Sequence, residues 1–385
     1  MSKSDIFLSA IIRNLKFRTK MQILLGSFYF FYFAIIGVYI IFMPKILSGI
    51  GYSASEIGII FASGPLVRFI LPFAFTKWLK LDARSFKTAL VVMLFSIATF
   101  YVSLDSFYKL ICSNISFNLG LSLILPYIEM ISLDTIGKER YGKIRLFGSI
   151  GFIVAALVLV KFLSDAYMAL NYLMVLSTLT AIVAFVIVNN ADASTKKHQD
   201  IQNDIDLLRD WKLWVGLTLM QVSFGTFYNF FTIYETDFGV SLDMTVYLWS
   251  FGVIAEIFML FFQGRLLRTN LLLILQITTF AASFRWFLIF LFPQNLAILF
   301  FAQTLHALSF ALFHSASISY LFHLYKHKPL AQQFFSGITY GLGGFVGALY
   351  AGFIYDMFPR QLFLSASIIA LGATFFIYLW SKKAT

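Results

Sequence analysis

Three ionisable residues lie deep inside apolar segments of this chain, namely Glu256, Arg285 and His306. An ionisable side chain in hydrocarbon costs about 3 kcal/mol even on lenient insertion scales, so it is retained where it pairs or functions. Glutamate and histidine can exchange a proton, whereas arginine keeps its charge and can pair with the carboxylate. We therefore predict a proton-coupling site. The alternatives are a structural ion pair between Glu256 and Arg285, and a neutral His306 bonded to a helix carbonyl.

The composition identifies the solvent that surrounds these residues. The 385-residue chain is 60% hydrophobic and 12% charged, and it contains 47 phenylalanines, more than a soluble core of this size needs. It is predicted to be a polytopic membrane protein, with the lipid bilayer as its main partner. The net charge of +11 would suggest nucleic acid for a soluble domain, but here it predicts topology, and no nucleic-acid partner is expected. The single cysteine, Cys112, excludes an internal disulfide.

Segments of roughly 17 to 25 apolar residues can cross a bilayer as helices. The first apolar run is too long for a signal peptide and lacks a cleavage site, so it is expected to stay in the membrane. The sequence predicts an all-α protein with twelve spans: 21–47, 57–76, 86–104, 107–133, 144–163, 167–188, 213–231, 245–262, 271–292, 295–322, 332–355 and 361–380.

Lysine and arginine predict the orientation of these spans. With the N-terminus in the cytoplasm, 23 of the 29 basic residues lie on the cytoplasmic side and four on the other. Lysine and arginine concentrate on the cytoplasmic side of membrane proteins, and a missed span would scramble the alternation. We expect a multi-pass protein of a bacterial-type cytoplasmic (inner) membrane with both termini in the cytoplasm.

The longest polar stretch separates six spans from six. The predicted organisation is a cytoplasmic tail (1–20), a six-helix bundle (21–189), a charged and partly helical linker (190–211), a second six-helix bundle (212–381) and a short tail (382–385). Two six-helix pseudo-repeats are the arrangement of the major facilitator fold, whose halves rock around a midplane site. In support, the second span of each half carries a charge, Arg68 or Glu256, and the fifth span of each half is rich in glycine.

Four motifs carry a more specific resemblance: YGKIRLFGSIGF (141–152), YLWSFGVIAEIF (247–258), FRWFLIF (284–290) and QTLHALSFALFH (303–314). They resemble, in order and in the corresponding spans, segments of the phenylpropionate:proton symporter branch of the major facilitator superfamily. That branch is related to the oligosaccharide and nucleoside proton symporters. The resemblance covers nearly the whole chain and implies secondary transport by alternating access, with the proton as coupling ion. It does not imply the cargo, because these branches share motifs across unlike substrates.

A further resemblance, to the lactose permease, implies roles for residues on spans eight, nine and ten. Equivalents of Glu256, Arg285 and His306 there serve cargo binding and proton transfer. This sequence has Ser309 where that relative has a second carboxylate, so Glu256 carries the proton alone, another group does, or transport is uncoupled. A rise of about 1.5 Å per residue places Glu256 about 10 Å nearer the cytoplasm than Arg285 and His306. Pairing of Glu256 with Arg285 then needs tilt, long side chains, or an intermediary such as water or His306.

Other polar and aromatic residues within the spans are candidates for cargo binding. Arg68 needs a counter-charge, for which Glu129 is the candidate unless it only reaches the interface. Two arginines near the membrane centre favour an anion, and aromatic rings could stack on cargo, so the best prediction is proton-coupled uptake of an aromatic or other small carboxylic acid. The predicted substrate-binding residues are Arg68, Glu129, Tyr228, Asn229 and Gln303.

Rival functions remain within the same fold and outside it. A nucleoside or sugar proton symporter would bind hydroxyl groups through amides and Glu256, and an uncoupled facilitator or drug exporter would share the architecture. An enzyme is not expected, because the chain has no HExxH motif, no serine nucleophile with its base and no acidic pair, and a nucleotide-driven pump is not expected, because the chain has no GxxxxGK[ST] loop. We expect no metal site and no cofactor other than the coupling proton. A monomer is expected, since one chain holds both halves.

Overall fold

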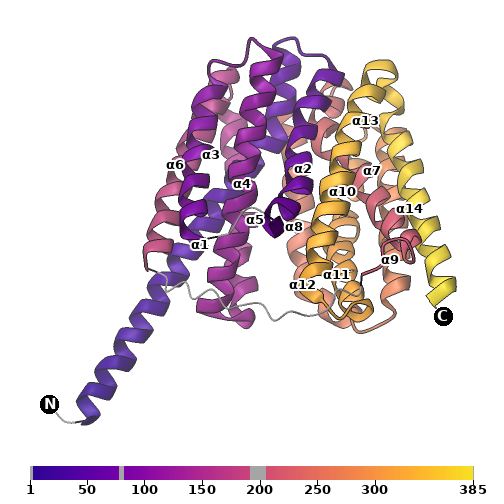
Figure 1. Cartoon of the computed structure of the whole chain (residues 1–385). Helices are drawn as coiled ribbons and strands as arrows, with labels where there is room; N and C mark the ends of the chain where they lie inside the picture. The colour runs from indigo at the N-terminus through magenta and orange to yellow at the C-terminus, as the bar shows by residue number, and fades with distance from the viewer. Residues whose placement is uncertain (1–2, 78–81, 191–204, 385) are drawn as a thin grey trace.

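The computed structural model describes residues 3–77, 82–190 and 205–384, and all regular secondary structure in these ranges is helical. The helices run back and forth in one bundle, with both termini at the same end (Figure 1). The first half contains α1 (Lys3–Gly49), α2 (Ala54–Lys77), α3 (Ala83–Phe100), α4 (Phe107–Ile136), α5 (Lys138–Phe162) and α6 (Ala166–Asn190).

The second half has the same number of membrane crossings, but two of them are built from several helical segments. The elements are α7 (Trp211–Asp237), α8 (Leu242–Leu266), α9 (Leu271–Leu291), α10 (Leu296–Thr304), η1 (Ala307–Leu312), α11 (Phe313–Leu324), α12 (Lys328–Phe334), η2 (Phe335–Leu342), α13 (Gly343–Met357), η3 (Pro359–Gln361) and α14 (Leu362–Ala384). The tenth crossing is α10, η1 and α11, and the eleventh is α12, η2 and α13. The segments η1 and η2 are π-helical, which the sequence pattern did not predict.

Eleven crossings in the described part of the chain are long and apolar enough to span a membrane by composition. The remaining predicted span, the seventh, is α7, which has 27 residues but carries more polar side chains, among them Gln221, Asn229 and Glu235. It packs against α14, α13 and α1 and is mostly buried. A helix surrounded by protein needs fewer apolar residues than one that faces lipid, so α7 completes the expected twelve crossings.

The expected segment boundaries differ from the observed helices mainly at the N-terminus. Helix α1 begins at Lys3, so most of the segment expected as a tail continues the first span as a helix that projects from the bundle (Figure 1). Most of the expected linker, residues 191–204, lies outside the described residues. Helix α6 ends at Asn190 and α7 begins at Trp211, close to the expected limits of the two bundles.

Glycine allows the first and fifth crossings of each half to pack closely. A Cβ atom at Gly151 of α5 would lie 2.0 Å from the carbonyl oxygen of Phe30 in α1. In the second half, a Cβ at Gly347 of α13 would lie 2.5 Å from the carbonyl oxygen of Val222 in α7. The two halves thus repeat one packing arrangement, as small residues at helix interfaces allow.

We expect Gly151→Leu to prevent assembly of the first half. Its side chain would overlap backbone, which cannot move aside as a flexible side chain can, and the loss of stability should exceed about 3 kcal/mol. Gly142→Leu in the same helix is the matched control, because a Cβ there meets nothing within 4 Å. Size-exclusion chromatography and thermal unfolding in detergent compare the two variants. Equal behaviour of both would contradict the packing of α1 on α5.

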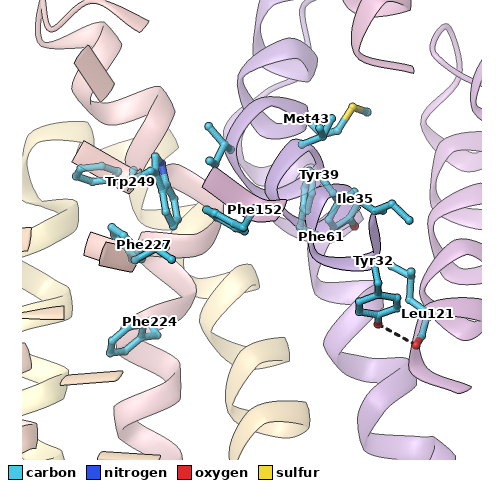
Figure 2. Packing of buried hydrophobic residues seen from close by; sticks show 14 of the residues in the cluster. Tyr32, Ile35, Tyr39, Met43, Phe61, Leu121, Phe152, Phe224, Phe227 and Trp249 are labelled. Atoms are coloured by element: carbon cyan, nitrogen blue, oxygen red, sulfur yellow. Dashed lines mark hydrogen bonds between the residues drawn. The ribbon is translucent and has the colours of Figure 1, made fainter. Parts of the chain in front are cut away.

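The two halves also contact each other through aromatic side chains. Phe152 of α5 points toward Trp249 of α8, with ring centroids 6.4 Å apart (Figure 2). Tyr32 of α1 instead donates a hydrogen bond to the carbonyl oxygen of Leu121 within the first half, at 3.0 Å (Figure 2). Some of the abundant aromatic residues therefore pack the halves internally and others pack one half against the other.

Candidate functional site

His306 lies between Arg285 and Glu256 in the second half. Arg285 Nη1 is 2.9 Å from His306 Nδ1, and His306 Nε2 is 3.9 Å from a carboxylate oxygen of Glu256. A guanidinium group only donates hydrogen bonds, so Nδ1 must accept, and the neutral ring carries its proton on Nε2, toward Glu256. Of the arrangements that the sequence allowed, the structure therefore has His306 as the intermediary between Glu256 and Arg285.

Aromatic rings and one amide hold Arg285 in place. Its Nη2 atom donates to Gln303 Oε1 at 2.6 Å, and its Cζ atom lies 4.2 Å from the ring centre of Phe227 and 4.4 Å from that of Trp286. Contact with aromatic faces stabilises a desolvated cation. A Cβ at Gly252 would lie 3.2 Å from Gln303 Oε1, so this glycine lets α8 approach the cluster closely.

The exposed fraction of the side chains decreases from Glu256 through His306 to Arg285. The side chain of Glu256 is 17% exposed and that of His306 is 7% exposed, whereas Arg285 and Gln303 are fully buried. Glu256 is therefore the most accessible member of the cluster and Arg285 is shielded in this conformation. Gln303, predicted to bind substrate, here serves to position Arg285.

The cluster stands where the tenth crossing changes its helical geometry. His306 directly precedes the π-helical segment η1, and its ring stacks on Phe310 with centroids 5.1 Å apart. Ser309, at the position where the lactose permease has a carboxylate, is buried and donates to the carbonyl oxygen of Leu305 at 2.9 Å. Short π segments often occur at functional sites, and this one begins directly after His306.

The first half contributes a second charged cluster, which corrects one sequence-based expectation. Glu129 does not pair with Arg68; it accepts a hydrogen bond from Tyr141 at 2.9 Å and lies 3.6 Å from Arg145 Nε. The cause is local, because α4 joins α5 through Gly137 alone and Glu129 therefore meets the first turns of α5. Arg145 also lies over the ring of Phe33, at 3.9 Å.

Arg68 is exposed and forms no ion pair with any other residue in the described ranges. It is within electrostatic range of Tyr228 and Tyr340 in the other half, and Glu256 is within range of the same two tyrosines. These two tyrosines are therefore within electrostatic range of both a cation of the first half and a carboxylate of the second. The arrangement brings Arg68 and Tyr228 toward the proton-coupling candidates.

Asn229 is half-buried and its side-chain amide donates to the carbonyl oxygen of Gly225 in its own helix, at 2.7 Å. Sequence reasoning did not place Tyr340 or Arg145 in the site. Arg145 is within electrostatic range of Glu256, and Tyr340 bonds to His314 Nδ1 at 2.8 Å. Pairing of residues more than a hundred positions apart leaves no local signal.

A separate hollow of about 560 Å³ near Tyr320 and Trp380 lies away from these clusters, at the end that holds the termini.

Comparison with known proteins decides the family. The model of the MFS_1 like family matches residues 22–365. The chain belongs to this family of major facilitator transporters. It is 25% identical to the "Probable 3-phenylpropionic acid transporter" of Escherichia coli (strain K12). This alignment of 367 residues covers 90% of this chain and 94% of the relative. It is 28% identical to the "Uncharacterized transporter YwbF" of Bacillus subtilis (strain 168) over 355 residues, 86% of each chain.

Solved structures show the same fold. The nucleoside transporter NupG superposes with a TM-score of 0.77 at 16% identity, covering 94% of this chain and 99% of that one. The human organic anion transporter MFSD10 gives a TM-score of 0.67 at 12% identity, with 94% and 99% covered. The expected all-α major facilitator fold is confirmed, and the protein is a multi-pass membrane transporter of a small-molecule solute rather than an enzyme.

Polar contacts close this transporter at the end opposite its termini. Asp237 of α7 accepts from Lys45 of α1 at 2.8 Å, and Lys161 of α5 pairs with Asp243 of α8. Asp356 of α13 caps α2, accepting from the backbone amides of Ala54 and Ser55 at 2.9 and 2.7 Å. All three contacts join the first half to the second at this end, and we refer to them together as the gate.

We expect Asp356→Ala to shift the conformational equilibrium toward opening of this gate. Loss of a capping carboxylate costs about 1–2 kcal/mol, which corresponds to a population shift of roughly 5- to 30-fold. Spin labels at cysteines replacing the exposed residues Ile50 and Phe358 report the distance between the halves, in a Cys112→Ser background. Asp105→Ala, which removes another exposed carboxylate at this end, is the control. An unchanged distance distribution in Asp356→Ala would show that this cap does not hold the gate.

Proposed function

We propose that this transporter takes up a small organic acid, best an aromatic carboxylate, together with a proton by alternating access. The observation that carries the proposal is Arg68, an exposed cation with no ion pair in the described structure, within electrostatic range of two tyrosines that are also within range of Glu256. A carboxylate cargo would neutralise Arg68, and its ring would stack between Tyr228 and Tyr340. The name of the Escherichia coli relative, a phenylpropionic acid transporter, supports this cargo class.

Coupling follows from the charge of Glu256. When Glu256 is ionised, its carboxylate repels an anionic cargo at Arg68, and when it is protonated the repulsion is absent. Proton and cargo therefore favour each other's binding by the same factor, as linkage requires. His306 presents its Nε2 proton toward Glu256, and Arg285 keeps the ring in that tautomer. The net step moves one proton from the medium onto the Glu256 carboxylate and returns it to the medium on the other side.

The proposed orientation follows the positive charge of the loops, with both termini in the cytoplasm of a bacterial cell and the protein in the inner membrane. With this orientation, the gate contacts lie on the outer side of the membrane. A single chain contains both halves and all residues of the proposed site, so we infer a functional monomer.

Proton movement in proteoliposomes tests the proposal. Purified protein is reconstituted with a pH-sensitive dye and challenged with aromatic acids, nucleosides and sugars. An aromatic acid should drive alkalinisation outside the vesicles, and uncharged cargo should not. Proton-coupled transport of a nucleoside or sugar would instead favour the rival symporter, and cargo entry with no proton movement would show an uncoupled facilitator.

A further inference from the structure

Glu235, near the end of α7, is a buried carboxylate with no partner. It is 0% exposed, and neither of its carboxylate oxygens forms a hydrogen bond with any described residue. An ionised carboxylate in such a place would carry the full cost of desolvation without compensation. The group is therefore protonated in this conformation.

The surrounding charges are already engaged with one another or face solvent. Asp237 is bound by Lys45 and by the hydroxyl of Tyr355, so neither cation nor hydroxyl is directed to Glu235. The remaining charged or titratable groups at this end of the helices packed on α7 also have partners or are exposed. They are Tyr234 of α7 itself, Asp243 and Tyr247 of α8, Glu56 of α2, Asp356 of α13 and Arg360 of η3. Asp243 is paired, Glu56 accepts from Ser53, Asp356 caps α2, Tyr247 and Arg360 are exposed, and Tyr234 donates to the Arg360 carbonyl oxygen.

Glu235 belongs to the same short segment as two carboxylates of the gate. The turn from α7 to α8 carries Asp237 toward α1 and Asp243 toward α5, and the backbone carbonyl of Glu235 accepts from Val240 in this turn at 2.9 Å. Separation of the halves at this end would break both ion pairs, which hold the segment that contains Glu235. The buried carboxylate and two contacts of the gate therefore share one segment of the chain.

We propose that Glu235 is a second proton-binding carboxylate of the transport cycle, which holds a proton while the gate is closed and exchanges it with the medium when the gate opens. The inference rests on the proposed proton coupling for its place in the cycle. It does not require Glu256 to be the coupling residue, since the two carboxylates lie at different depths of the second half. The proton moves only between the Glu235 carboxylate and water, so no other reactant is needed.

Infrared spectroscopy of the full-length, membrane-reconstituted protein tests this inference without cargo. Wild type near neutral pH should show the carbonyl stretch of a protonated, non-hydrogen-bonded carboxyl group. Glu235→Gln, which keeps the shape of the neutral acid, should lose this band, and Glu256→Gln should retain it. Opening the gate should weaken proton binding at Glu235 by about tenfold, so the band should vanish at lower pH in Gly352→Val. A Cβ at that position lies 2.6 Å from the carbonyl oxygen of Ala54 and forces α13 away from α2.

Two results would overturn the inference. The absence of a Glu235-dependent band in wild type would show that the carboxylate is ionised. A band that titrates identically in wild type and in Gly352→Val would show a permanent structural proton. Neither readout depends on transport, so failure of this inference is separate from failure of the proposed symport, which the proteoliposome measurements decide.

Discussion

Replacing Arg68 with glutamine should raise the concentration of aromatic carboxylate needed for half-maximal uptake by about 30- to 100-fold. Truncating one member of a desolvated charge pair costs about 2–5 kcal/mol, and the lower part of this range fits a cation that is exposed in the empty site. Glutamine retains the length and polarity of the side chain, so the loss reports the charge. Initial rates of radiolabelled cargo uptake into proteoliposomes give the measurement.

Two comparisons make this result specific to an anionic cargo. Arg68→Lys should recover part of the affinity, because it restores the charge but not the bidentate geometry of a guanidinium group. Arg145→Gln serves as a contrast: Arg145 is already paired with Glu129, so its loss should weaken cargo binding less. If Arg68→Gln takes up the aromatic acid with wild-type affinity, the cargo does not use this cation, and a sugar or nucleoside becomes the better proposal.

Glu256→Gln should abolish proton movement with cargo while exchange of cargo across the membrane continues. The neutral amide mimics the protonated acid, so cargo at Arg68 is no longer repelled and the binding of cargo becomes independent of pH. In wild type, a lower pH on the outside should increase uptake, because protonation of Glu256 favours the anion. In the variant, uptake should be flat across the same pH range and should reach equilibrium without accumulation.

The control for this variant is Glu56→Gln, which removes a carboxylate that only caps the first turn of α2 by accepting from Ser53. Its proton-to-cargo ratio should equal that of wild type, measured with the dye and radiolabelled cargo in the same vesicles. Continued accumulation of cargo against its gradient by Glu256→Gln would assign coupling elsewhere, with Glu235 as the next carboxylate to test.

The architecture was predictable from sequence because each span carries its own signal. An apolar run of sufficient length must form a helix in lipid, and basic loops alternate from one side to the other. Helix α7 shows the limit of this reasoning: it is too polar to stand out by composition as the other spans do, and the alternation of the basic loops supports its assignment. The π-helical segments η1 and η2 were not predictable, because the choice between α and π geometry depends on tertiary contacts.

For the candidate site, the amino-acid sequence by itself determined which residues had to be special, because an ionisable side chain inside an apolar run is visible without a structure. Glu256, Arg285 and His306 were found in this way, and so was Arg68. Only the tertiary structure decided their partners: His306 between Arg285 and Glu256, Arg145 rather than Arg68 beside Glu129, and no hydrogen-bond partner for the Glu235 carboxylate among the described residues. The reason is physical, since burial in a span is encoded locally by hydropathy, whereas distances between side chains on different helices depend on tilt, rotation and depth, which no local pattern specifies.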